Sequence, residues 1–362
     1  MTGASVGVWR SRVKVALASQ IAGARGLVTP FARDGHQPLI LGYHRVVEDF
    51  DREARTSIPS MLISRAMFEQ HLDHIGRQFR FVSLDDIDER VGRGEPFMEP
   101  VAAVTFDDGY RDVYEHAMPI LLRKGIPAAV FVITGIVGRS CWQAHDKLYH
   151  LINKAFTTWP KPDRELQEFL AQVNVPADGV PGVGAVRCPI DAISTLLPVL
   201  AQTDLRRVID GLEASVGNGF CSMPLTMTWP MVTEMRRAGF TIGSHTRRHV
   251  SLPAEPEGSL GAELEGSRRE LRDQLGEPIV HFAYPGGYFT PVVVEAVRRA
   301  GYRCGYTACR HGDRRTALTL ERLILWERSS VNADGRFVPA VLDCLTHGLW
   351  PPAFRCERVH ES

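Results

Sequence analysis

Short apolar runs alternate with amphipathic stretches along most of the chain. Nearly continuous apolar runs of this length are typical of strands buried on both faces. Seven strands are therefore predicted, at Pro38–His44, Val101–Phe106, Ala128–Thr134, Phe240–Ser244, Ile279–Tyr284, Tyr302–Thr307 and Leu320–Leu325. Apolar positions three and four residues apart predict helices between them. These helices are expected at Ser64–Gln78, Val113–Lys124, Met231–Ala238, Leu260–Leu275 and Pro291–Ala300. Strands separated by helices indicate an α/β fold with a parallel sheet, either open or closed into a barrel, whose sites form at the carboxyl ends of the strands.

Residues 138–226 interrupt this alternation. Helical patterns occur there at Asp146–Phe156, Arg164–Gln172, Asp191–Ala201 and Leu205–Val216. The Pro/Gly-rich segment Val175–Pro189 between them predicts a loop. We interpret residues 138–226 as a helical insertion, because the strand pattern resumes directly after it. Residues 37–362 would then form one domain, preceded by a separate segment of residues 1–36.

Composition limits the kinds of partner. The chain has 42 basic and 42 acidic residues, and this zero net charge argues against a protein built to coat nucleic acid. Its seven cysteines contain no C-x-x-C pair, which favours free thiols in a reducing compartment. No apolar run is long enough to span a membrane. Cytoplasmic localisation is the first expectation.

The segment 8–28 is basic early and apolar later, with Ser19 and Gln20 interrupting the apolar stretch that a secretory signal would need. It predicts either peripheral association with a membrane surface or a leading helix packed on the domain. Export is not excluded by this pattern.

The first chemical cluster is T-F-D-D-G-Y, residues 105–110, at the end of a predicted strand. Asp107 and Asp108 are adjacent carboxylates that repel each other, and a bound cation would compensate for this while leaving one of them free as a base. Taken alone, an Asp-Asp-Gly sequence is more often a solvated turn.

The second cluster is S-H-T-R-R-H, residues 244–249, after another strand. His245 and His249 are four residues apart, a spacing that on one helical turn places both rings on the same face. As a pair alone they would more often be exposed loop histidines. Together with Asp108 they offer two imidazole nitrogens and one carboxylate oxygen, a set that leaves positions open for water and substrate. Zinc, iron, cobalt or nickel would accept it.

Two further segments follow strands. In F-A-Y-P-G-G, residues 282–287, the Pro285–Gly286 turn follows Tyr284 and has backbone N–H groups that could stabilise an oxyanion. By itself it is a plain strand-to-helix turn. His44 ends the first strand in L-G-Y-H; a lone histidine there is more often structural, but it shares its strand-end position with the other clusters.

These motifs, in this order, resemble those of polysaccharide deacetylases of the NodB-homology group, carbohydrate esterase family 4. T-F-D-D-G-Y resembles the first motif of the family, S-H-T-R-R-H its H-[ST]-x-x-H motif, and F-A-Y-P-G-G its third. Residues 115–132 and 225–246 resemble the segments around the first two motifs, and the likeness covers about residues 37–137 and 225–327.

The resemblance implies a distorted (β/α) barrel with about seven strands. It implies Asp107 as the catalytic base, and a divalent metal ion on Asp108, His245 and His249, with zinc expected first and cobalt, nickel or iron as alternatives. It also implies His44 as the general acid, as in a subgroup acting on poly-N-acetylglucosamine. Tyr284, Pro285 and Gly286 would contact the substrate or the oxyanion.

The third motif departs from the common R-x-P-Y-G pattern. Ala283 stands in the position of the arginine that usually steadies the base, and Gly286 stands in the position of the tyrosine. The third motif therefore does not identify the residue that orients Asp107. No clear late L-x-x-H motif occurs either, and His347 is the alternative acid.

The function predicted is metal-dependent hydrolysis of N-acetyl groups on an amino-sugar glycan, either a polysaccharide or a lipid-linked saccharide, with release of acetate. One alternative is an O-acetyl esterase, and another is a non-catalytic sugar-binding protein on the same fold. Phosphodiester chemistry is disfavoured, since the extra carboxylates of a two-metal site are missing. The insertion could wall the substrate cleft with Trp142, Trp159 or Trp229, although buried core positions are at least as typical of tryptophan.

Overall fold

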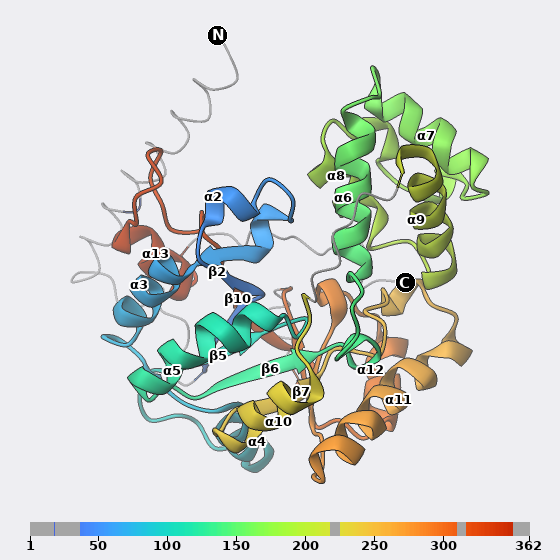
Figure 1. Ribbon diagram of the computed structural model, residues 1–362. Coiled ribbons are helices and arrows are strands. Elements are labelled where there is room, and N and C mark those ends of the chain that lie inside the picture. Colours follow the sequence, from blue (N-terminus) through green and yellow to red (C-terminus); the bar gives the residue numbers. More distant parts are fainter. Residues whose placement is uncertain (1–17, 19–36, 218–224, 310–315, 350–362) are drawn as a thin grey trace.

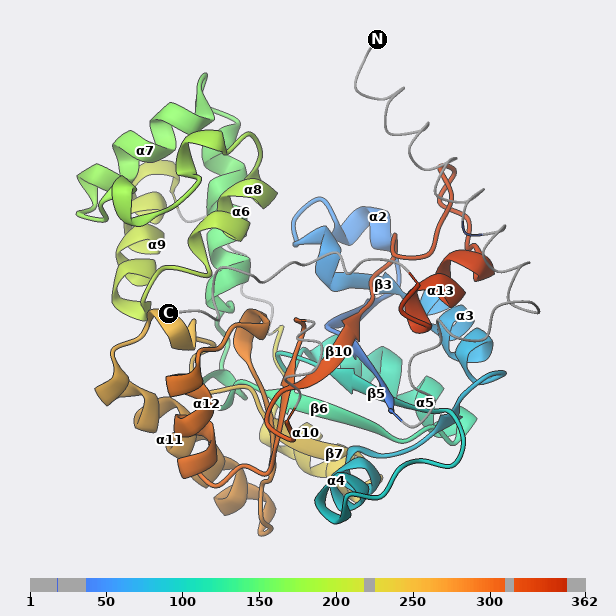
Figure 2. The same ribbon diagram turned by 180° about the vertical axis from the view of Figure 1, so that it is seen from behind.

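The computed structural model describes residue 18 and residues 37–217, 225–309 and 316–349. Its centre is a closed barrel of parallel strands (Figures 1 and 2). The seven barrel strands are β1 (Leu39–Tyr43), β5 (Val101–Phe106), β6 (Ala128–Val132), β7 (Thr241–Ser244), β8 (His281–Ala283), β9 (Cys304–Thr307) and β10 (Leu320–Ile324). β1 pairs with β10 on one side and with β5 on the other, and this pairing closes the ring. The predicted seven-stranded (β/α) barrel is confirmed.

Three short strands lie outside this ring. β4 (Arg80–Phe81) pairs with the start of β5, and β2 (Arg45–Val47) and β3 (Leu62–Ser64) form a separate parallel pair. The sequence analysis did not predict these strands, because two or three residues are too few to show a period.

The register of the barrel aligns the carboxyl ends of neighbouring strands. Tyr43 lies opposite Phe106, Phe106 opposite Val130, and Val132 opposite Ser244. Each residue that follows one of these ends therefore reaches the same end of the barrel. His44, Asp107 and His245 occupy such positions, after β1, β5 and β7.

Helices cover the outside of the barrel (Figures 1 and 2). They are α3 (Arg65–Ile75), α4 (Leu84–Arg93), α5 (Met118–Lys124), α10 (Trp229–Arg237), α11 (Glu257–Leu275), α12 (Pro291–Arg299) and α13 (Pro339–Thr346), whereas the short helix α2 (Phe50–Glu53) lies beyond the carboxyl end of β1, against β3. The predicted helix Val113–Lys124 begins as a π-helical turn, Val113–Ala117, and continues as α5. Pro119 lies at the start of α5 and lacks the N–H that a continuous α-helix would need there. Helix α4 was not predicted, although Ser83 and Asp86 form a capping box at its start.

The insertion forms a group of helices at one end of the barrel (Figures 1 and 2). Its helices are α6 (Ala144–Phe156), α7 (Pro162–Gln172), α8 (Pro189–Leu196) and α9 (Gln202–Val216). They share an apolar core of their own, with Leu148, Leu166 and Leu212 fully buried. Helix α8 ends before the predicted Ala201, because Pro198 lacks the N–H that the next helical hydrogen bond would need. The chain enters the insertion after β6, so the insertion leaves from the carboxyl ends of the strands.

Only Ala18 of the N-terminal segment is described. It is buried against Val341 and Cys344 of α13, which indicates a segment packed on the domain at that position. The remainder of residues 1–36 lies outside the described residues. In the described part of the chain, no helix is both long enough and apolar enough to cross a membrane. In the same described ranges, Cys141, Cys188, Cys304, Cys309 and Cys344 form no disulfide.

Candidate active site and metal centre

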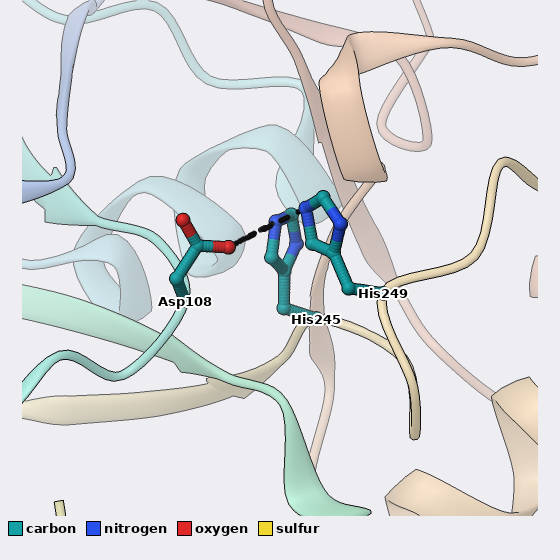
Figure 3. Close-up of side chains that lie close together, drawn as sticks. All are labelled: Asp108, His245 and His249. Carbon is teal, nitrogen blue, oxygen red and sulfur yellow. Dashed lines mark ion pairs between the residues drawn. The ribbon is translucent and has the colours of Figure 1, made fainter. Parts of the chain in front are cut away.

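Asp108, His245 and His249 converge at the carboxyl end of the barrel (Figure 3). One ligand atom from each lies within 4.8 Å of the others. Oδ1 of Asp108 is 3.5 Å from Nε2 of His245 and 3.4 Å from Nε2 of His249. The side chain of His249 is 18% exposed, whereas those of Asp108 and His245 are almost fully buried. The site is therefore open on the His249 side.

The surroundings of the Asp108 carboxylate fit a bound cation. Both of its carboxylate oxygens are buried and have no hydrogen-bond partner among the described residues. Burial, together with the charges of Asp107 and Asp146, raises the pKa of Asp108 well above its usual value. A buried carboxylate without partners is costly, and a metal ion held between Asp108 and the two imidazoles would remove that cost.

Hydrogen bonding sets the tautomer of His245. Its Nδ1 is 2.8 Å from the carbonyl oxygen of Ala283, which can only accept, so Nδ1 carries the proton. The lone pair is then on Nε2, the nitrogen that faces Asp108. Burial lowers the pKa of His245 to about 4 and that of His249 well below its usual value. Both rings are thus neutral near pH 7, as metal ligands must be.

Three non-glycine residues of the site have left-handed backbone. The φ angles are 72° at Asp108, 64° at Thr246 and 57° at His249. The spacing of His245 and His249 was interpreted as one helical turn, but the structure has no helix there. These residues form a turn in which the left-handed residues bring the two rings together. Such conformations cost about 1–3 kcal/mol each and persist where surrounding contacts enforce them, often at functional sites.

Glu263 on α11 holds this turn in place. Its fully buried carboxylate accepts hydrogen bonds from the backbone N–H groups of Arg247 and Arg248 and from Nε of Arg248. Thr246 adds a further bond, because its Oγ1 accepts the N–H of His249. The sequence analysis did not identify Glu263. A glutamate at a core position of an amphipathic helix was the available signal, since buried charges need partners.

Arg322 on β10 orients Asp107. Its two terminal nitrogens lie 2.6 and 2.7 Å from the two carboxylate oxygens of Asp107, and its side chain is 1% exposed. Nη1 also donates to Oγ1 of Thr105. Burial by itself raises the pKa of Asp107, but the charge and hydrogen bonds of Arg322 outweigh it and lower the pKa to about 2. Asp107 is therefore ionised throughout the neutral range.

His44 lies beside this ion pair. Its Nε2 is 4.0 Å from Oδ2 of Asp107, and its side chain is 20% exposed. Burial lowers the pKa of His44 to about 4 despite the opposite effect of the Asp107 charge, so the ring is neutral near pH 7. The predicted base and the predicted acid are thus neighbours at the mouth of the barrel.

The third motif forms a tight turn after β8. Gly286 is exposed at its tip with φ of 63°, and a Cβ there would lie 2.4 Å from the ring of Tyr288. The turn is closed by the N–H groups of Gly287 and Tyr288, which donate to the carbonyls of Tyr284 and Pro285. The N–H of Gly286 is not among these donors.

A family model described as polysaccharide deacetylase matches residues 94–164 and 188–305, just over half of the chain. The chain belongs to the polysaccharide deacetylase family. It is accordingly a hydrolase, and its activity is the deacetylation of a glycan.

Several solved structures have a similar fold at low sequence identity. A Streptococcus pyogenes deacetylase, PplD, in complex with acetate is 18% identical with a TM-score of 0.52, covering 82% of this chain and 95% of its own. IcaB from Ammonifex degensii is 22% identical with a TM-score of 0.51, covering 86% and 98%. A de-N-acetylase from Aggregatibacter actinomycetemcomitans is 16% identical with a TM-score of 0.51, covering 81% and 97%. No curated protein matches the chain significantly.

In this polysaccharide deacetylase the arginine that pairs with Asp107 comes from β10 instead of the third motif. Ala283 occupies the usual arginine position and contributes its carbonyl oxygen to His245. The sequence analysis did not identify Arg322. The signal was two charged residues, Glu321 and Arg322, inside a predicted barrel strand, where a buried charge requires a partner of opposite charge.

Tyr284, a predicted substrate-binding residue, and His347, the alternative acid, have structural positions instead. The ring of Tyr284 is fully buried between Phe282 and Phe289, and its hydroxyl donates to the carbonyl of Leu318. The expected substrate contact of this side chain is therefore corrected to a core role. His347 ends α13, where Nδ1 donates to the carbonyl of Asp343 and the ring packs on Phe79. Phe79 directly precedes β4, which pairs with the start of β5, so His347 lies toward the amino ends of the strands.

The three tryptophans differ in position. Trp159 packs between Phe156 and Phe169 in the core of the insertion, as the alternative interpretation expected. Trp229 packs on the barrel core at the start of α10. Trp142 is half-buried in the segment leading into α6, with its ring 5.7 Å from that of His150. Of the three, Trp142 lies nearest in the chain to the residues that contact Asp108.

Proposed function

We propose that the chain is a metal-dependent deacetylase that removes N-acetyl groups from amino sugars of a glycan, either a polysaccharide or a lipid-linked saccharide. The main support is one arrangement of side chains: three metal-ligand candidates lie beside a carboxylate that Arg322 keeps ionised. The N-acetyl preference is consistent with the de-N-acetylase among the structures of similar fold.

A divalent metal ion would be held by Oδ1 of Asp108 and Nε2 of His245 and His249. Two histidines and one carboxylate with open positions are typical of catalytic zinc, and cobalt, nickel or iron accept the same ligands. When bound, such an ion supplies a Lewis acid that polarises the acetyl carbonyl and makes water a better nucleophile.

Asp107 and His44 carry out the proton transfers. Asp107 accepts the proton of the attacking water, because Arg322 keeps it ionised and fixed in direction. The exposed N–H of Gly286 is the candidate donor to the oxyanion. His44, 4.0 Å from Asp107, relays the proton to the departing nitrogen. The products are acetate and a glycan amine.

The second candidate function is removal of O-acetyl groups by the same site. An alkoxide is a better leaving group than an amine anion, so an ester depends less on a proton donor. His44 beside Asp107 therefore favours the amide substrate. Acetate release should be compared between N-acetylated and O-acetylated glycans, for the metal-loaded protein and its His44→Ala variant.

We expect faster release from the N-acetylated glycans. His44→Ala should retain the metal and lose most turnover on them, with a smaller loss on an activated aryl acetate. Preference for O-acetylated glycans would make the protein an esterase. Equal losses on both substrate types would indicate a structural role for His44.

The remaining proposals rest on the sequence. Residues 37–362 are proposed as one deacetylase domain that includes the insertion. Peripheral membrane association through residues 1–36 in a cytoplasmic protein also stays a proposal, and the burial of Ala18 against α13 favours a packed segment at that point.

A further inference from the structure

The start of helix α6 contacts Asp108, although the helix belongs to the insertion. Nε2 of His145 is 3.7 Å from Oδ2 of Asp108, and Nε2 of Gln143 donates to the backbone carbonyl of Asp108. Oδ1 of Asp108 faces His245 and His249. The two oxygens of this carboxylate therefore have different surroundings: one faces the metal-ligand candidates, and the other faces His145.

A hydrogen-bonded group fixes the orientation of His145. The hydroxyl of Tyr110 is 2.7 Å from Oδ2 of Asp146 and 2.8 Å from Nε2 of His145. The carboxylate of Asp146 only accepts, so the Tyr110 hydroxyl donates to it and accepts from His145. The proton of His145 is then on Nε2, the nitrogen that also faces Asp108. His145 and Asp146 are each 3% exposed and Tyr110 is 0% exposed, so water does not compete for these bonds.

We propose that His145 is a positioning residue for Asp108. Its Nε2–H group donates to the Tyr110 hydroxyl and lies 3.7 Å from Oδ2 of Asp108, where its partial positive charge attracts that oxygen and would leave Oδ1 directed at a metal ion. Polar groups just outside the ligands generally orient those ligands and raise metal affinity. The insertion is then a structural part of the metal centre, joined to it through His145, Gln143 and Asp146. This inference rests on the metal site of the proposed function.

Direct metal binding by His145 is the competing arrangement. Its Nδ1 is buried without a partner among the described residues. However, His145 is not among the residues whose ligand atoms all lie within 4.8 Å of one another. Its ring also lies against that of His249, with centroids 4.7 Å apart. The geometry thus favours a role through Asp108.

The test compares His145→Leu, which fills the space but cannot donate, with His145→Gln, which can. His150→Ala is the matched control, on the same helix and half-buried. Zinc affinity is measured by competition with a chelating dye, thermal unfolding monitors the fold, and the visible spectrum of the cobalt-loaded protein reports the ligand set. We expect zinc binding about 10–100-fold weaker in His145→Leu, the usual effect of losing such a partner. The loss should be smaller in His145→Gln and absent in His150→Ala, and the cobalt spectrum should keep its band pattern.

Wild-type zinc affinity in a folded His145→Leu would overturn the inference. A cobalt spectrum with a changed coordination number would also overturn it, in favour of direct ligation. If His145→Leu does not fold, Tyr110→Phe decides the question: it removes the oxygen that holds His145, and it should weaken zinc binding, whereas unchanged binding would contradict the inference. A wild-type protein that binds no zinc would instead refute the proposed function.

Discussion

At the scale of single residues, Asp107 and Arg322 form a buried ion pair. Both side chains are almost fully buried and joined by two hydrogen bonds. Removing one partner of such a pair leaves an uncompensated buried charge, which typically costs about 3–5 kcal/mol. The pair therefore matters to stability as well as to the direction of the base.

Arg322→Met should lower the free energy of unfolding by about 3 kcal/mol or more for this reason. In the double variant Asp107→Asn, Arg322→Met the loss should be smaller than the sum of the single losses, because neither charge remains. Urea unfolding of the metal-free variants measures both effects. Arg272→Met is the control, since Arg272 is 57% exposed in a surface ion pair, and a change of at most about 1 kcal/mol is expected. Additive losses at the two positions would show that the pair is not coupled.

Asp107→Asn tests the base separately from the metal. The amide keeps the size of the side chain but cannot take a proton from water. Turnover should fall by about two to four orders of magnitude, the range typical of general acid–base catalysis. Metal content, measured by elemental analysis, should remain that of the wild type. Unchanged turnover with unchanged metal would place the base elsewhere.

At the scale of elements, the sequence predicted the strands and their carboxyl ends well. All seven predicted barrel strands overlap observed ones, because buried parallel strands are nearly continuous apolar runs that end at polar motifs. The pattern of apolar runs could not show that Arg322 pairs with Asp107. Their contact depends on closure of the barrel, which brings β10 against β1 and β1 against β5. The contact of His145 with Asp108 likewise depends on how the insertion folds back over the barrel.

The turn after β7 also depends on another element, helix α11. Glu263→Gln keeps the shape of the side chain but loses its charge, and hydrogen bonds to a charged group contribute about 1.5–3 kcal/mol. We expect a loss of stability in that range and weaker zinc binding, because the turn sets the positions of His245 and His249. Unfolding and dye-competition titrations give the two values.

Glu265→Gln is the control for this change, on the same helix and exposed. It should leave both values unchanged. If Glu263→Gln binds zinc as tightly as the wild type, the turn holds its conformation without α11.

At the scale of the whole molecule, buried histidines determine the response to acid. Burial lowers the pKa of His71 to about 3, with Tyr43 and Ser330 as its neighbours, and lowers those of His44 and His245 to about 4. The unfolded chain binds these protons at about pH 6.5. Below that pH the unfolded state holds more protons than the folded state, so stability is full above pH 6.5 and falls as the pH drops.

For His71 this predicts a loss of about 2 kcal/mol between pH 6.5 and pH 5, since one pKa unit corresponds to about 1.4 kcal/mol. His71→Gln should be less stable at pH 8 yet show a shallower decline toward pH 5. Urea unfolding of the metal-free protein across this range measures the slope, with His116→Gln, a partly exposed position, as the control. Equal slopes in the wild type and His71→Gln would contradict this account.

Metal dependence and N-acetyl hydrolysis are tested together by a zinc titration of the metal-free protein, followed by acetate release from N-acetylglucosamine oligomers. We expect no turnover without metal, a linear rise as zinc is added, and a break at one equivalent per chain. Full turnover in the metal-free protein would contradict this expectation, as would a protein saturated with zinc that releases no acetate from any N-acetylated glycan.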